Sequence, residues 1–129
     1  MKPASRLAAA IGSPARTSAE GQMGIRINGI VVDANDLDLL AEFWSRLLGL
    51  AITRREDDWI SLGPHFALQR VPEAKSVKNR VHLDLVADDF PQAVALAVEL
   101  GASPVDRMQE DLWQVWRDPE GNEFCICVS

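Results

Sequence analysis

The chain has 129 residues, of which 47% are apolar, so it is long enough for one compact domain with a buried core. Its formal net charge of −6 argues against nucleic-acid binding, which needs clustered Lys and Arg. No apolar run approaches the roughly 20 residues that a membrane-spanning helix requires. Cys125 and Cys127 share one predicted strand, where a disulfide between them would be strained, and this favours a reducing, cytoplasmic location.

Residues 1–23 differ in composition from the rest of the chain. They are rich in Ala, Ser, Pro and Arg, and no acidic residue precedes Glu20. We interpret them as a flexible tail, because they contain few large apolar side chains that could pack. Two alternatives remain open: the short apolar run 7–12 belongs to a targeting peptide, or Met23 is the true start. The folded domain is predicted for residues 24–129.

The first repeat of the domain is predicted for residues 25–71. A strand over 25–33 precedes an apolar-periodic helix over 36–48, with Asn35 or Asp36 as its N-cap and Gly49 as its C-terminal stop. Three short strands follow, separated by an acidic turn and a Gly-Pro turn, over 50–55, 57–62 and 66–71.

The second repeat, residues 80–128, follows a polar linker over 72–78 and has the same order of elements. A strand over 81–86 leads to a helix over 91–100 that is capped by Asp88 or Asp89. Three strands are then predicted over 104–108, 112–117 and 123–128. Asp36 and Asp89 are 53 positions apart (89 − 36), and a spacing of this kind indicates two copies of one supersecondary unit.

Two β-α-β-β-β repeats predict an α+β fold, in which a cupped mixed β-sheet carries both helices on its outer face. The other face of the sheet is then open. Strand alternation places Asp33, His82 and Asp84 on that open face and their apolar neighbours in the core. Trp113 and Trp116 differ by an odd number, so one is predicted in the core and the other on the open face.

Several motifs resemble those of the vicinal oxygen chelate superfamily, and most closely its glyoxalase-like domains. They are the repeated plan itself, the helix carrying Phe43-Trp44 and ending in Leu48-Gly49, the run from Arg80 to Asp84, and the turn from Asp118 to Asn122. The superfamily includes glyoxalases, bleomycin resistance proteins and extradiol dioxygenases. The resemblance implies the cupped fold for residues 25–128 and a homodimer.

The resemblance also implies a divalent metal held by up to four side chains, at positions that correspond here to Gly29, Ala67, His82 and Cys125. Gly and Ala supply no donor atom, so we expect no metal or other cofactor. The alternative is a divalent metal on a shifted set, in which Gln69 joins His82 and Cys125, with Cys127 as a further soft ligand for Zn²⁺.

The predicted function is binding of a small organic molecule in the cup, without the full metal site and without a nucleic-acid or membrane partner. The residues expected to line the cup are Asp33, Gln69, His82, Asp84, Trp113 and Cys125. The acidic net charge favours a cationic or amine-bearing ligand. Whether the protein is an enzyme stays open: the alternative is a lyase, isomerase or dioxygenase of the glyoxalase type, in which His82 keeps a metal or is the catalytic base.

Overall fold

The computed structural model describes residues 24–129, and the predictions made for residues 1–23 lie outside this range. The first repeat contains β1 (Ile30–Ala34), α2 (Leu37–Leu48), β2 (Ile52–Glu56), β3 (Trp59–Leu62) and β4 (Phe66–Arg70). The second contains β5 (Leu83–Ala87), α3 (Phe90–Leu100), β6 (Ser103–Pro104), β7 (Trp113–Arg117) and β8 (Glu123–Val128). Neither helix is long and apolar enough to cross a bilayer.

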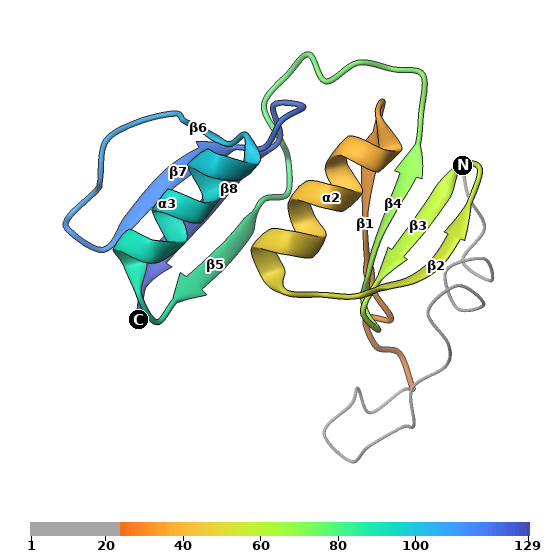
Figure 1. Cartoon of the computed structure of the whole chain (residues 1–129), viewed down its shortest axis with the longest axis horizontal. Coiled ribbons are helices and arrows are strands. Elements are labelled where there is room, and N and C mark those ends of the chain that lie inside the picture. The colour runs from red at the N-terminus through yellow and green to blue at the C-terminus, as the bar shows by residue number, and fades with distance from the viewer. Residues whose placement is uncertain (1–23) are drawn as a thin grey trace.

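Each repeat forms its own four-stranded mixed sheet, with one helix packed on it (Figure 1). The strand orders are β1-β4-β3-β2 and β5-β8-β7-β6, with the first pair in each sheet parallel and the others antiparallel. This confirms the predicted α+β class and the two repeats. Within residues 24–129 the cup consists of two separate sheets, because no ladder joins the edge strands β1 and β5.

Two strands are shorter than predicted by three residues or more, whereas the ends of the others differ by at most two residues, so that β5 begins just after His82. The first strand begins at Ile30. Ile25 and Ile27 precede it and are 78% and 84% exposed, so they do not pack on the sheet as predicted. In the second repeat β6 contains only Ser103–Pro104. After β6 the chain no longer pairs with β7, and it reaches the start of β7 through Glu110 and Asp111. Both residues have positive φ angles (51° and 54°), so this segment is a turn.

Both helices begin and end as the sequence predicts. Asp36 and Asp89 are the N-caps, and each accepts a hydrogen bond at 3.0 Å from the backbone N–H three residues on. Gly49 and Gly101 follow the last turns with φ of 66° and 110°, a left-handed conformation that favours glycine.

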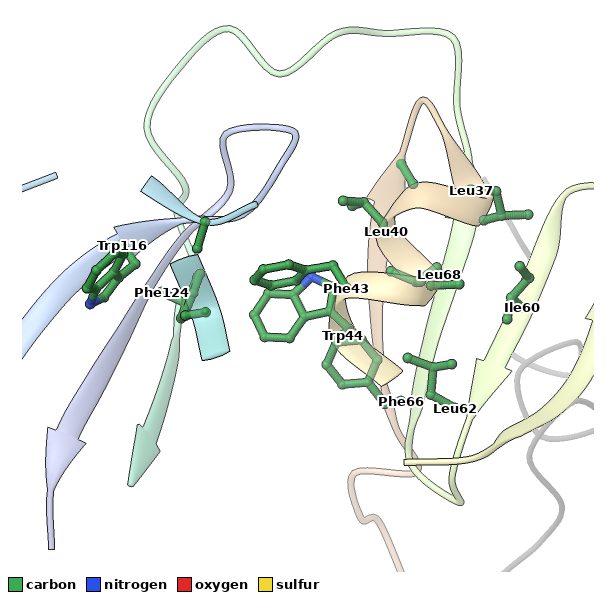
Figure 2. Close-up of a cluster of buried hydrophobic side chains, with 14 of the residues drawn as sticks. Leu37, Leu40, Phe43, Trp44, Ile60, Leu62, Phe66, Leu68, Trp116 and Phe124 are labelled. Atoms are coloured by element: carbon green, nitrogen blue, oxygen red, sulfur yellow. The ribbon is translucent and has the colours of Figure 1, made fainter. Parts of the chain in front are cut away.

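An aromatic cluster on α2 joins the two repeats (Figure 2). The Trp44 ring, 2% exposed, lies 5.7 Å from the ring of Phe66 in the first sheet and 5.0 Å from that of Phe124 in the second. Phe43 also contacts Phe124, with ring centroids 5.9 Å apart. Burial of several aromatic side chains at one point is a large apolar contribution, so the repeats share one core.

The turn between β7 and β8 reinforces this junction through Asp118, which is 3% exposed. Its Oδ1 accepts the backbone N–H groups of Glu120 and Asn122, at 2.9 and 3.0 Å. Its Oδ2 accepts the Trp44 indole N–H at 3.1 Å and the Asn122 amide at 2.8 Å. The buried carboxylate is therefore fully hydrogen-bonded, as a buried charge must be.

Glu120 from the same turn binds the first repeat just before the start of α2. Its two carboxylate oxygens accept the backbone N–H groups of Asn35 and Asp36, at 2.7 and 2.6 Å. These N–H groups lie just before α2, where a negative charge also interacts favourably with the helix dipole. The turn that the sequence marks as a motif thus holds the two repeats together.

Candidate functional site

The side of each sheet that is turned away from its helix is called the open face here. Strand alternation places Val31, Ala67 and Gln69 on the open face of the first sheet. Asp84 and Cys125 occupy the corresponding places on the second, because Val31 pairs with Ala67 as Asp84 pairs with Cys125. The register inferred from the repeat therefore holds in three dimensions.

The four positions that the superfamily uses for its metal do not fit a four-ligand site in this chain. Gly29 has no side chain, and Ala67 is fully buried in a small cluster with Trp59 and Val31. Only His82 and Cys125 carry donor atoms. Two donors are too few for a site of this type, so no reaction step is derived through it.

Three candidate residues meet on the second sheet. His82 Nε2 lies 3.1 Å from Asp84 Oδ1, and the ligand atoms of His82, Asp84 and Cys125 all lie within 4.8 Å of one another. The His82 and Asp84 side chains are 48% and 67% exposed, whereas Cys125 is buried. A carboxylate beside an imidazole can orient the ring.

Both thiols on this face are poorly ionised at neutral pH. Burial raises the pKa of Cys125 above its usual 9.0, and the nearby Asp84 carboxylate and Cys127 thiol raise it further, against a smaller opposing effect of Lys78. Burial and Asp84 likewise raise the pKa of Cys127. Because the thiolate is the nucleophile, this environment does not favour covalent catalysis by Cys125.

The remaining predicted site residues lie elsewhere. Gln69 donates a hydrogen bond to Asp33 at 3.0 Å on the open face of the first sheet. Asp33 lines a cavity of about 560 Å³ along the seam between β1 and β5, and His82 lines it from the second repeat. Trp113 is half-buried opposite Cys127 and lines neither this cavity nor the pocket on the second sheet. Trp116 is in the core, which agrees with the prediction that one of the two tryptophans is buried there.

A pocket of about 570 Å³ covers the open face of the second sheet. Its floor comes from β7 and β8 together with His82, which lies just before β5, and the linker between the repeats forms one wall. The principal lining residues are Lys75, Lys78, His82, Val115, Arg117, Glu123 and Cys125. This volume is in the range of small-molecule sites, which combine apolar walls with a few polar groups.

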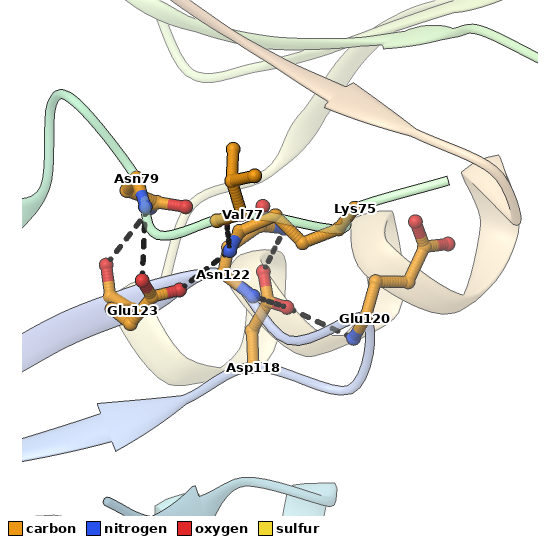
Figure 3. Close-up of polar contacts among 7 residues, drawn as sticks. All are labelled: Lys75, Val77, Asn79, Asp118, Glu120, Asn122 and Glu123. Carbon is orange, nitrogen blue, oxygen red and sulfur yellow. Dashed lines mark hydrogen bonds and ion pairs between the residues drawn. The ribbon is translucent and has the colours of Figure 1, made fainter. Parts of the chain in front are cut away.

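Glu123 anchors the linker wall of this pocket (Figure 3). Its carboxylate accepts the Asn79 backbone N–H at 2.9 Å and forms an ion pair with Lys75 at 2.9 Å. Burial alone would raise the pKa of Glu123, but the contacts with Lys75 and Asn79 outweigh it, and the net pKa is lowered. Lys75 also donates to the backbone carbonyl of Val77, so this cation is fully engaged.

Two cations in the pocket are not engaged. Within residues 24–129 the side chains of Lys78 and Arg117 make no hydrogen bond or ion pair. The three carboxylates of the lining all have partners: Glu123 pairs with Lys75, Glu120 accepts two backbone N–H groups of the first repeat, and Asp106 accepts N–H groups of its near neighbours in the chain. The sequence analysis missed both cations and Glu123. Strand alternation could have found Arg117 and Glu123, since Arg117 is in step with Val115 and Glu123 with Cys125.

Residues 29–127 match the family model described as a glyoxalase-like domain. No curated protein sequence matches the chain. Many solved structures are similar to the chain, and two of them serve as examples. A glyoxalase/bleomycin resistance protein/dioxygenase family enzyme from Burkholderia phytofirmans PsJN has a TM-score of 0.67 at 16% identity, with 81% of this chain and 98% of that chain covered. The trypanothione-dependent glyoxalase I of Leishmania major has a TM-score of 0.65 at 16% identity, covering 81% and 87%.

Proposed function

Because the chain belongs to the glyoxalase-like domain family of the vicinal oxygen chelate superfamily, we propose that it binds a small organic molecule on the open face of its second repeat. The observation that carries this proposal is the pocket of about 570 Å³, whose floor is the open face and whose wall is the linker. Val105 and Val115 supply apolar surface, and His82 and Arg117 supply polar groups at the rim.

The charges around the pocket favour an anionic group on the ligand. Among residues 24–129, Lys78 and Arg117 are the cations of the pocket that have no partner. Of the nearby carboxylates, Glu123 is neutralised by Lys75, and Asp106 already accepts two N–H groups. A guanidinium binds a carboxylate through two parallel hydrogen bonds, which gives both strength and orientation. The net charge of −6 suggested a cationic ligand, but the local arrangement supports the opposite sign.

The test is a thermal-shift screen of metal-free protein with pairs of small carboxylic acids and their neutral amides. Acids should raise the melting temperature more than their amides, because a ligand that binds only the folded state stabilises it. For the best acid, Arg117→Gln should weaken binding in calorimetry by about tenfold, the value of one charge-assisted hydrogen bond. Arg107→Gln is the matched control, since Arg107 is exposed and outside the pocket. Amides binding as well as acids would refute the anionic class, and no stabilisation by any member would refute the binding proposal.

The His82–Asp84 pair favours a second candidate function, catalysis by general acid–base chemistry. Its 3.1 Å contact has the geometry of a carboxylate that orients a catalytic imidazole. Once a ligand is identified, His82→Asn should lower turnover by about a hundredfold or more, and by a larger factor than it lowers affinity. Equal turnover by the variant would refute a catalytic role for His82.

The homodimer expected from the sequence stays a prediction. Exposed apolar side chains on the second repeat supply the surface for it, including Val81, Val86 and Leu112, at 78%, 69% and 54% exposure. Size-exclusion chromatography with light scattering should give twice the chain's 14.2 kDa. A mass equal to one chain at tens of micromolar protein would refute the dimer.

A further inference from the structure

We propose that the open face of the first repeat is an interaction surface for the chain's own N-terminal segment, residues 1–23, which docks over Trp59, Ser61 and Ala67. These three side chains are completely buried, at 1%, 0% and 0% exposure, although they lie on the face turned away from α2. Docking is tested on protein without ligand, so its failure is distinguishable from failure of the binding proposed for the second repeat.

The second repeat shows how much of an open face the sheet itself can bury. Trp113 on β7 is the counterpart of Trp59 on β3, because the partners of both lie two residues beyond the matched positions Ala67 and Cys125. The two strands also have the same place in their sheets. Trp113 is nevertheless only half-buried, so the complete burial of Trp59 needs cover that the second face does not have.

Within residues 24–129, little packs on the first open face. Helix α2 lies on the other side of the sheet, against Ile60 and Leu62 of β3 (Figure 1). Among these described residues, Val31 is the only apolar side chain packed against the cluster of Trp59 and Ala67. Side chains on one face of a sheet stand side by side, so a second layer is needed to bury them completely. Residues 1–23 are the part of the chain left to form that layer.

Charge favours the same segment. The first open face and its edge carry four carboxylates and two arginines, namely Asp33, Glu56, Asp57, Asp58, Arg54 and Arg70. Residues 1–23 carry three Lys or Arg residues and a single acidic residue, Glu20. Opposite charges of this kind select a partner and its orientation more than they add affinity. We therefore expect the cations of the segment to lie towards the acidic turn that joins β2 and β3.

The segment is long enough to cross the face. Gly24 precedes β1, the edge strand of the first sheet, by six residues (30 − 24). A fully extended chain of this length, residues 1–23, spans up to ~75 Å, whereas four strands about 4.8 Å apart are only roughly 15 Å wide. The segment can therefore reach every part of the face without displacing β1.

The side chains of the face and of the segment are complementary in type. Leu7 and Ile11 supply apolar surface for the floor made by Trp59 and Ala67. The Gln69 Oε1 atom is buried and accepts no hydrogen bond within residues 24–129, and a buried acceptor without a donor costs free energy. A backbone N–H of the docked segment supplies that donor.

The experiment measures which residues the N-terminal segment lies near in the full-length protein. A nitroxide is attached through Ser13→Cys to ¹⁵N-labelled protein whose native thiols are removed by Cys125→Ala and Cys127→Ser. The Trp59 indole N–H and the backbone amides around it should lose most of their NMR intensity relative to the reduced label, whereas signals of the second open face keep theirs. Even, weak broadening over both sheets, or broadening centred on the second open face, would overturn the proposal.

Mixing nitroxide-labelled ¹⁴N protein with unlabelled ¹⁵N protein identifies the chain that supplies the segment. No broadening is expected in the mixture, because each segment docks on its own chain. Broadening around Trp59 in the mixture would show that a second copy covers the face, which would overturn docking within one chain.

Two double variants test the contact in protein that keeps its native cysteines and carries no label. Leu7→Ser with Ile11→Ser should shift the Trp59 indole N–H signal and leave the other three indole signals in place, because only the cover of the first face is weakened. Ile25→Ser with Ile27→Ser is the matched control, since these isoleucines are 78% and 84% exposed, and it should shift none of the four. A Trp59 signal that ignores the first pair, or moves equally with both pairs, would contradict the assignment.

Discussion

The two repeats have the same order of elements but different open faces. In the first repeat Ala67 and Trp59 are buried, and Gln69 is hydrogen-bonded to Asp33. In the second, His82, Arg117 and Cys125 line a pocket, and Asp84 lies beside His82. The core faces are alike in both repeats, since each packs apolar side chains against its helix.

The difference shows which strand positions of a repeat are needed for the fold and which can differ between the repeats. Alternate strand positions face the helix and must stay apolar, whereas the intervening positions can change without loss of the core. The first repeat uses its intervening positions for packing, and the second uses them for polar donors. We infer that binding belongs to the second repeat alone.

The largest effect is expected at Trp44, where the repeats meet. Trp44→Ala should lower the free energy of unfolding by about 3–5 kcal/mol, because it removes a fully buried aromatic ring in contact with both sheets. Leu96→Ala is the matched substitution in α3, because Leu96 precedes Gly101 by as many residues as Trp44 precedes Gly49, and it should cost only about 1–2 kcal/mol because Leu96 is half-buried. Urea unfolding measures both. Equal losses would contradict the view that α2 supplies the shared core.

Trp44→Phe separates packing from hydrogen bonding at the same position. It keeps an aromatic ring but removes the indole N–H that donates to Asp118. The expected loss is smaller than that of Trp44→Ala, since the Asp118 carboxylate keeps its other three donors. A loss as large as that of the alanine variant would show that the hydrogen bond, and not the ring, joins the repeats.

A pH-dependent effect of intermediate size is expected at Glu123. Its folded-state pKa is lowered from 4.5, so its ionised form adds stability above that value, and the contribution is lost as the pH falls through the lower folded pKa. At neutral pH, Glu123→Gln should cost about 1–2 kcal/mol, the net value of a charge-assisted hydrogen bond.

The measurement is urea unfolding of wild type and variant over a pH series that extends below 4.5. The difference between the two proteins should shrink as the acid range is entered. Glu99→Gln removes an exposed carboxylate from α3 and is the control for loss of a surface charge. A difference that is constant with pH would contradict the ionic role of Glu123.

The smallest effects are expected at the two helix N-caps. Asp36→Ala and Asp89→Ala should each cost about 1 kcal/mol, because each removes one hydrogen bond to the first turn. Thermal unfolding of Asp88→Ala provides the control, since Asp88 is exposed and adjacent to the cap without making its hydrogen bond. If Asp88→Ala proved as destabilising as Asp89→Ala, the cap would be placed wrongly.

The fold could be predicted from sequence because its signals are local. Asp36 and Gly49 mark one helix, Asp89 and Gly101 mark the other, and the spacing of 53 between the two caps reveals the repeat. The strand at Ser103–Pro104 was overestimated, because its end depends on how the following turn packs and not on local alternation.

The candidate site was only partly accessible to the same reasoning. Alternation placed His82, Asp84 and Cys125 on one face, and the structure adds that their ligand atoms meet. Strand alternation could not place Lys78, because the linker has no periodicity. The position of the linker depends on contacts such as that between Asn79 and Glu123. Long-range contacts of this kind carry no local signal in the sequence.

The most direct test of a binding site confined to the second repeat is to map ligand contacts by two-dimensional NMR of the metal-free protein. Backbone amide shifts are recorded during titration with the small carboxylic acid that stabilises the protein most. The account predicts saturable shifts at residues of the second open face, including Asp84, Val115, Arg117 and Cys125. Saturable shifts centred instead on Asp33, Ala67 and Gln69 of the first sheet would contradict it.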